Sequence, residues 1–257
     1  MKDHLSLLLF ASMALAACNS RQVEDVVLDY GYDYYPLEVG RSWVYQVDSI
    51  IYDPALGGTS IDSSRTYFRE VVTDTLHGES GTLFYRVEHY ERKADTLPWQ
   101  IGKVYTLSRD EQRAYRDEDN LRFIKLAFPV KAGQEWDGNA FFDPFTQVTV
   151  AGERIEMFKS WSYRQLTNGE PQAIGNLSFD DVITVQNADS RDNVIELRLA
   201  TEQYARGVGL AYRSLDILDT ECRVCCNGDT GDACQGLSWP EKAEKGFSLR
   251  QQLISYQ

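Results

Sequence analysis

Four cysteines gathered late in the chain have the residue type and spacing that most directly suggest chemistry: Cys222, Cys225, Cys226 and Cys234. Thiols this close together bind zinc, exchange electrons in a Cys-x-x-Cys centre, or join as disulfides. A four-thiol zinc site commonly uses two Cys-x-x-Cys pairs, and only the first pair here has that spacing. A redox Cys-x-x-Cys lies beside a βαβ unit, and no such unit is readable in the sequence. We therefore predict structural disulfides, with zinc binding and redox chemistry as the alternatives.

The pairing of these cysteines has two solutions. A ring between the adjacent Cys225 and Cys226 is strained, so each is expected to pair elsewhere. The solutions are Cys222–Cys225 with Cys226–Cys234, and Cys222–Cys226 with Cys225–Cys234. We favour the second, because its overlapping links brace more of the long loop predicted at 219–246.

Acidic and histidine side chains form no recognisable catalytic set. Carboxylates are adjacent at Asp117-Glu118-Asp119 and Asp180-Asp181, but glycoside hydrolysis needs two carboxylates about 5 to 9 Å apart across a cleft. Neighbours on a strand point to opposite faces, so we predict solvated surface for these runs. His77 and His89 are the only histidines after His4, and the sequence has no Gly-x-Ser-x-Gly elbow and no phosphate-binding glycine loop. Oxygen-rich turns at 137–143 and 227–232 lack the EF-hand spacing. We predict no metal and no cofactor.

The beginning of the chain carries an export signal. Leu5–Leu15 is an apolar run of eleven residues, which is too short to span a bilayer and ends in small residues. The following Leu15-Ala16-Ala17-Cys18 resembles the lipobox of bacterial lipoprotein precursors. This resemblance implies cleavage before Cys18 and attachment of three acyl chains to its sulfur and amine. Such an anchor holds a protein stably in a membrane, whereas a single chain does not.

The residues after Cys18 bear on location. Asn19 stands where aspartate retains an enterobacterial lipoprotein at the inner membrane, so the outer membrane is favoured. Glu24 and Asp25 resemble the acidic surface-export signal of Bacteroidota lipoproteins, although they lie somewhat farther from Cys18. Both the periplasmic face and the cell surface therefore stay open.

Beyond this region the sequence alternates with the period of two that is typical of strands with one buried face. Clear examples are Trp43–Asp48, Leu83–Glu88 and Val194–Leu199, with similar runs near 65–75, 103–107, 121–128, 146–150, 154–158, 177–186, 208–218 and 247–256. We predict a signal peptide at 1–17, an acidic tether at 18–33, and one all-β domain at 34–257. The domain is expected to be an antiparallel sheet, barrel-like or a sandwich, with one short helix near Trp239–Lys245. Strands at 210–218 and 247–256 are expected to pair on either side of the loop 219–246.

One motif occurs twice, as aromatic-Pro-aliphatic-charged-aliphatic-Gly-x-x-Trp at Tyr35–Trp43 and Phe128–Trp136. We interpret the copies as two hairpin beginnings of one sheet rather than a duplicated half-domain, and we expect Trp43 and Trp136 to be buried counterparts. Together with Tyr204–Leu210 and Leu249–Tyr256, these blocks resemble uncharacterised lipid-anchored cell-envelope lipoproteins of Bacteroidota. That resemblance implies a compact anchored domain and brings no known activity.

The amino-acid composition argues against two classes of binding partner. Lys and Arg number 26 against 39 Asp and Glu, a formal net charge of −13, which speaks against nucleic acid and against broad adhesion to anionic lipids. We expect a lipid-anchored cell-envelope lipoprotein with a non-catalytic binding or assembly role, bound to the membrane through Cys18. The candidate partners are an outer-membrane protein, a glycan or a lipid. The alternatives are an extracytoplasmic glycan-acting enzyme and a lipid or lipoprotein carrier. Convergent carboxylates in the largest cavity would favour the enzyme, a dry apolar groove the carrier, and exposed aromatic rings glycan binding.

Overall fold

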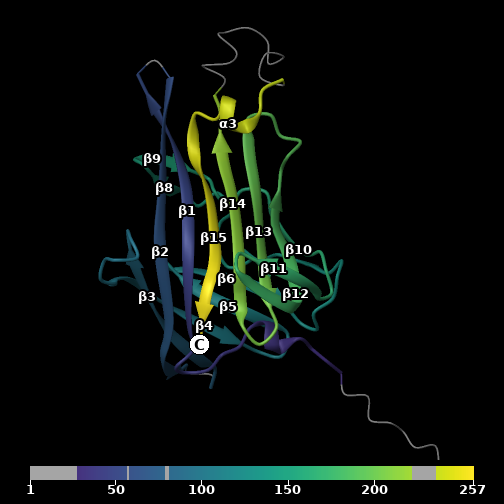
Figure 1. Ribbon diagram of the computed structural model, residues 1–257. Coiled ribbons are helices and arrows are strands. Elements are labelled where there is room, and N and C mark those ends of the chain that lie inside the picture. Colours follow the sequence, from purple (N-terminus) through teal and green to yellow (C-terminus); the bar gives the residue numbers. More distant parts are fainter. Residues whose placement is uncertain (1–27, 57, 79–80, 222–235) are drawn as a thin grey trace, which may run out of the picture.

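The computed structural model describes residues 28–56, 58–78, 81–221 and 236–257 (Figure 1). Strands dominate these residues, accompanied by the 3-10 turn η1 (Tyr32–Tyr34) and the short helix α3 (Trp239–Lys242). The strands in chain order are β1 (Ser42–Ala55), β2 (Gly58–His77), β3 (Leu83–Arg92), β4 (Gln100–Arg109), β5 (Arg113–Glu118), β6 (Leu121–Ala127), β7 (Glu135–Trp136), β8 (Val148–Val150), β9 (Glu153–Ile155), β10 (Trp161–Gln165), β11 (Glu170–Ile174), β12 (Leu177–Asp189), β13 (Glu196–Ala205), β14 (Gly209–Asp219) and β15 (Lys245–Tyr256).

In the described residues, one large antiparallel sheet contains all strands except β8 and β9, which form a separate hairpin. The order across the sheet is β6-β5-β4-β3-β2-β1-β15-β14-β13-β12-β10-β7, with β11 beside β12. Two meanders, β1 to β6 and β12 to β15, are joined where the first strand pairs with the last. The pairing of β14 with β15 confirms the predicted neighbours, and α3 confirms the predicted helix.

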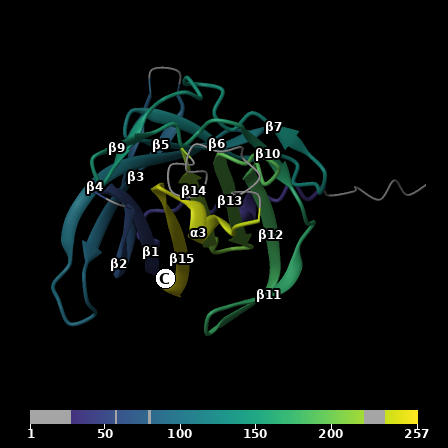
Figure 2. The same ribbon diagram turned by 90° about the horizontal axis from the view of Figure 1, so that it is seen from above.

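The sheet curls until its two edges meet, and Figure 2 shows the strands arranged around an interior. The backbone N–H of Ile124 on β6 donates to the carbonyl of Gly138, just after β7, at 2.8 Å. The indole Nε1 of Trp136 donates back to the Ile124 carbonyl at 3.0 Å. These contacts make the sheet a nearly closed barrel. The predicted all-β class is therefore confirmed, in its barrel-like form.

The two ends of the barrel are built differently (Figure 1). At one end the segment around η1 lies beside the β13–β14 turn, where the Gly207 N–H donates to the Asp33 carbonyl at 2.8 Å. The hydroxyl of Tyr35, which belongs to the same segment, donates to the Tyr115 carbonyl at 2.8 Å. Residues 28–33, which the sequence assigned to the tether, thus contact the domain. At the opposite end α3 packs on a small apolar cluster that contains Tyr52 and Leu218.

The two tryptophans of the repeated motif have different surroundings. Trp43 is buried at the start of β1, in the middle of the sheet, and its Nε1 donates to the Val208 carbonyl at 2.6 Å. Trp136 is only half-buried, because it lies in the two-residue strand β7 at the sheet edge. The expected burial holds for Trp43, and Trp136 is not its structural counterpart. None of the helices in the described ranges is long and apolar enough to cross a membrane.

Candidate functional site

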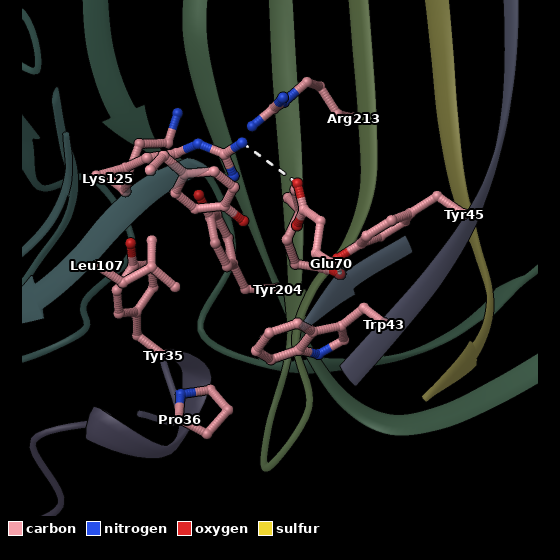
Figure 3. A pocket seen from close by; sticks show the side chains of 13 residues that line it. Tyr35, Pro36, Trp43, Tyr45, Glu70, Leu107, Lys125, Tyr204 and Arg213 are labelled. Carbon is pink, nitrogen blue, oxygen red and sulfur yellow. Dashed lines mark hydrogen bonds and ion pairs between the residues drawn. The ribbon is translucent and has the colours of Figure 1, made fainter. Parts of the chain in front are cut away.

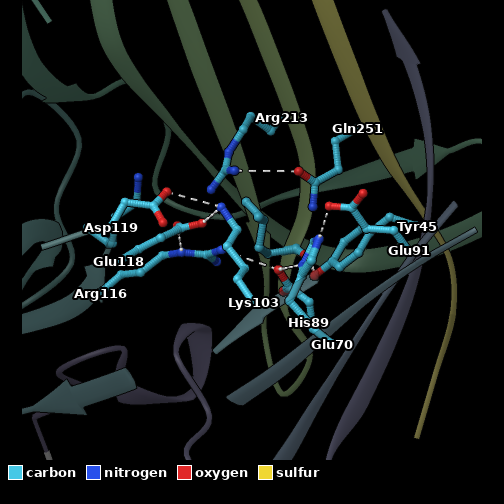
Figure 4. A network of polar contacts seen from close by, with 12 residues as sticks. Tyr45, Glu70, His89, Glu91, Lys103, Arg116, Glu118, Asp119, Arg213 and Gln251 are labelled. Carbon is cyan, nitrogen blue, oxygen red and sulfur yellow. Dashed lines mark hydrogen bonds and ion pairs between the residues drawn. The ribbon is translucent and has the colours of Figure 1, made fainter. Parts of the chain in front are cut away.

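Six ionisable side chains meet inside the barrel, and we refer to them as the interior charge cluster. They come from five strands that are distant in the sequence: Glu70 on β2, Arg116 and Glu118 on β5, Lys125 on β6, Glu202 on β13 and Arg213 on β14. Figure 4 shows part of this network and the donors that extend it. Three cations face three carboxylates, so the interior is balanced in charge at neutral pH.

Glu202 is the centre of one half of the cluster. Its side chain is almost fully buried and receives the Lys125 ammonium at 2.8 Å and the Arg213 Nε at 2.8 Å. The Tyr204 hydroxyl donates to it at 2.8 Å and the Asn187 amide at 3.4 Å. Four donors therefore satisfy one carboxylate. Lys125 and Glu202 stand on opposite meanders, so their ion pair ties the two halves of the barrel together.

Glu70 and Arg116 form the other half. Arg116 Nη2 lies 3.3 Å from Glu70, and Arg116 Nε donates to Glu118 at 2.5 Å. His89 Nδ1 lies 3.3 Å from the same Glu70 oxygen. The guanidinium of Arg116 also stacks on the ring of Tyr105, 3.7 Å from its centroid. Lys103 binds the second oxygen of Glu118 at the outer limit of the network.

Strand periodicity explains why these charges point inward. On β13 the alternate residues Ala200, Glu202 and Tyr204 are all buried, while Thr201 and Gln203 between them are half-buried. Side chains two residues apart share a face of a strand. A charge that falls on the buried phase is therefore carried into the interior, where it needs a partner of opposite sign.

The electrostatic field of the cluster shifts the pKa values of its members. Burial raises the pKa of Glu202, but Lys125 and Arg213 outweigh burial and lower it to about 2. Burial also raises the pKa of Glu70, but Arg116 and His89 outweigh burial and lower this pKa to about 2. The pKa of Lys125 is lowered to about 8, mainly by burial, with Glu202 opposing that shift. All of these groups are charged at neutral pH.

Two cavities adjoin the cluster and share the side chains of Arg116, Lys125 and Arg213. The small cavity, on the η1 side, has a volume of about 40 Å³ (Figure 3), which is room for very few waters. Its walls include Tyr35 and Trp43.

We call the larger one the amphipathic cavity, with a volume of about 390 Å³. Its lining combines apolar and aromatic side chains with members of the interior charge cluster. Its apolar lining is Leu121, Phe123, Val148, Met157, Phe158, Trp161 and Leu215.

A third hollow, of about 800 Å³, lies on the outer face of the sheet beside α3. Its β13 residues Leu197 and Leu199 are out of phase with Glu202, which places them on the outside. Its floor is apolar and its rim carries serines and two ion pairs. Asp216 binds Arg250 with both oxygens at 2.8 Å. Asp48 binds Arg65 at 2.6 and 3.0 Å. This groove therefore has an apolar floor, and both of its carboxylates are engaged.

The structure places some of the predicted site residues and leaves others outside its scope. Cys18, Cys222, Cys225, Cys226 and Cys234 lie outside the described residues, so the anchor and the disulfides stay predictions. The turn at 227–232 lies there too. In the described turn at 137–143, Asp137 and Asp143 accept backbone N–H groups two residues ahead at 2.9 Å, which is ordinary turn geometry.

The expectation of solvated surface is wrong for Glu118. Its side chain is 15% exposed and lies between Arg116 and Lys103, because it shares a face of β5 with Arg116. Asp181 is also engaged, since Arg206 Nε donates to it at 2.5 Å. Within the described ranges, no three His, Cys, Asp or Glu side chains converge as metal ligands.

Most of the interior charge cluster escaped the sequence analysis. A signal was present for part of it nonetheless, because some of these charges fall in step with apolar residues on their strand. Glu70 stands between Phe68 and Val72, and Glu202 between Ala200 and Tyr204. A charged residue in the buried phase of an alternating strand predicts a buried ion pair, although it does not name the partner.

No protein-family model matches this chain, and no curated protein does. Among solved structures, the chain is similar to a candidate lipoprotein from Parabacteroides distasonis, with a TM-score of 0.38, 9% identity, and coverage of 87% of this chain and 98% of that one. It is also similar to a candidate exported protein with a YmcC-like fold from Bacteroides fragilis, with a TM-score of 0.36, 9% identity, and coverage of 86% and 97%.

Proposed function

We propose that this chain is a lipid-anchored cell-envelope protein with a non-catalytic binding role, and that the amphipathic cavity takes its ligand. The ligand class that fits is a molecule with an apolar body and a polar head. The body would lie against Phe123, Phe158 and Trp161, and the head against the interior charge cluster.

The composition of the amphipathic cavity carries this proposal. A volume of about 390 Å³ falls in the range of small-molecule sites. Such sites combine predominantly apolar walls with a few convergent polar groups that fix the ligand's orientation. Here aromatic side chains line the same space as Arg116, Lys125 and Arg213.

The state of the carboxylates favours binding over hydrolysis. A glycoside hydrolase needs one carboxyl group that stays protonated to act as the acid. Glu70, Glu118 and Glu202 are each bound by cations, and the pKa of each is lowered. All three are therefore ionised at neutral pH and held by their partners. This supports the binding role over the alternative of a glycan-acting enzyme.

The anchor and the location belong to the same proposal. The lipobox ending at Cys18 would hold the barrel at a membrane, with the outer membrane favoured by Asn19. The described chain begins beside η1, so this end of the barrel would lie nearer the lipid (Figure 1). Disulfides among the four late cysteines remain part of the proposal as a brace for the loop between β14 and β15.

Blocking the amphipathic cavity tests the proposed ligand site. Val148 lines the cavity, and a Val148→Trp substitution would fill part of it. Full-length protein is extracted from its membrane, and the non-covalently bound lipids are identified by mass spectrometry of an organic extract. We expect the wild type to retain a defined amphiphile and Val148→Trp to lose it.

Val150→Trp is the matched control. Val150 lies two residues along β8, is equally half-buried, and is not among the residues around the amphipathic cavity. Both variants replace a valine by the same indole side chain, so nonspecific binding of detergent or lipid to that side chain is matched between them. A lipid profile that is the same in Val148→Trp as in the wild type would refute the cavity as the ligand site.

A further inference from the structure

A patch of arginine and aromatic side chains covers the outer face of β2 and β3. We call it the arginine–aromatic patch, and its members are Tyr67, Arg69, Tyr90, Arg92 and Trp99. Cross-strand register builds it, since Arg69 stands opposite Tyr90 and Tyr67 opposite Arg92. Cations and rings therefore alternate in both directions on this face. Glu70 and His89 form the adjacent pair of this register and point to the interior, so the patch is separate from the cavities.

Both guanidinium groups of the patch stack on rings. Arg69 lies 4.6 Å from the Tyr90 centroid and 5.1 Å from that of Trp99. Arg92 lies 4.3 Å from the Trp99 centroid and 5.3 Å from that of Tyr67. Trp99, just before β4, thus holds both cations near one ring. Stacking fixes the planes of the guanidinium groups and does not use their N–H groups.

The two arginines lack compensating charge. In the part of the chain that the structure describes, neither Arg69 nor Arg92 forms an ion pair with a carboxylate. The Nε atoms of both are buried without a hydrogen-bond partner among the described residues, and Arg92 Nη1 donates to the Asp95 carbonyl at 2.6 Å. The neighbouring Glu88 accepts from Tyr90 but is already paired with Arg86 at 2.6 Å. Two uncompensated cations on a chain of net charge −13 mark a place where an anion is favoured.

We propose that the arginine–aromatic patch binds an acidic saccharide. Each ring of such a polymer brings a carboxylate for a guanidinium edge and an apolar C–H face for an aromatic side chain. The alternation of arginine and ring on β2 and β3 matches that combination. An acidic peptide would match the charges but has no sugar ring to lie against the parts of the aromatic side chains that stay exposed.

Titration with oligogalacturonate tests the proposal, using the full-length protein in nanodiscs of zwitterionic lipid. We expect binding by isothermal titration calorimetry that weakens with added salt. Arg69→Gln and Arg92→Gln should each weaken it at least tenfold. The methyl-esterified oligosaccharide, which keeps the sugar and loses the charge, should bind at least tenfold more weakly. Polyglutamate, which keeps the charge and lacks the sugar, should also bind at least tenfold more weakly.

Arg65→Gln is the matched control. Arg65 lies on the same face of β2, four residues from Arg69, but Asp48 already binds it at 2.6 and 3.0 Å. Its loss removes the same formal charge and should change the affinity less than twofold. Thermal melting of each variant is measured first, and Trp99→Leu, outside the strands, replaces any arginine variant that does not fold. An equal loss in Arg65→Gln, equal binding of polyglutamate, or no binding of oligogalacturonate would each overturn the proposal.

Discussion

Glu202 shows what a carboxylate requires when it is placed inside a barrel. Two cations, a phenol and an amide surround it, and its side chain is almost fully buried. Withdrawing ions from water is expensive, and the pair is tolerated because every partner is present. Removing one partner therefore lowers the free energy of unfolding by more than the intact ion pair contributes to it.

Glu202→Gln should lower the free energy of unfolding by about 3 to 5 kcal/mol, because Lys125 and Arg213 would lose their shared anion in a buried site. Urea denaturation at pH 7 measures this loss. Glu170→Gln, on the exposed side of β11, is the control and should change stability by less than about 0.5 kcal/mol. Equal stability of the two variants would show that the interior charges are not coupled.

The same residue predicts how stability depends on pH. The pKa of Glu202 is about 2 in the folded protein against 4.5 as its ordinary value. Between these values the unfolded chain binds more protons, so stability is lost as the pH falls through this window. This carboxylate should account for about 2 kcal/mol of the loss between pH 7 and pH 3. The stability lost on acidification should then be smaller by that amount in Glu202→Gln, whereas parallel pH profiles would contradict the assignment.

Part of this site can be predicted from the sequence, and the rest cannot. A charge in the buried phase can be read from Glu70 or Glu202 and their apolar neighbours. The partner cannot be read, because Lys125 and Glu202 are 77 residues apart and meet only when the barrel closes. Glu118 was misassigned for the same reason, since its burial depends on Arg116 and Lys103 being beside it.

At the scale of elements, alternation predicted the long strands and missed some short polar ones. β1, β3 and β13 have the clear period of two, because one face of each meets the core. β5 and β11 were not predicted, since Arg113–Glu118 and Glu170–Ile174 are too polar to show a buried phase. The pairing of β1 with β15 is also absent from any local pattern, because it joins the two ends of the domain.

Closure of the barrel depends on a glycine. The Gly138 carbonyl accepts the Ile124 N–H, and a Cβ at Gly138 would lie 2.2 Å from the buried ring of Tyr163. Gly138→Ala should therefore cost about 1 to 3 kcal/mol of stability through overpacking. Gly58→Ala, where a Cβ meets nothing within 4 Å, should be close to neutral. Thermal melting compares the two, and equal melting temperatures would contradict close packing at the seam.

At the scale of the whole molecule, the proposed function assigns the membrane anchor to one end of the chain and ligand binding to the barrel. The described residues begin at the η1 end, and α3 lies at the opposite end (Figure 1). The acidic charge of −13 opposes direct adhesion to anionic lipid, so attachment to a membrane would depend on the proposed anchor.

Cys18→Ser should move the protein from the membrane fraction to the soluble fraction or leave its precursor unprocessed, because the acyl chains have no other attachment point. Fractionation of cells followed by detection of the chain measures this. Cys234→Ser is the control, since it also removes one thiol and leaves the lipobox intact. Retention of Cys18→Ser in the membrane at the wild-type level, without a bound partner, would refute the anchor.

The central claim is that an amphiphile occupies the amphipathic cavity, and quenching of Trp161 fluorescence tests it most directly. Trp161 lines the cavity, whereas Trp99 lies on the outer face of the barrel. Brominated fatty acid, a quencher on contact, is titrated into the full-length protein. Saturable quenching should persist in Trp99→Phe and largely disappear in Trp161→Phe. Quenching that stays the same without Trp161 would contradict the claim.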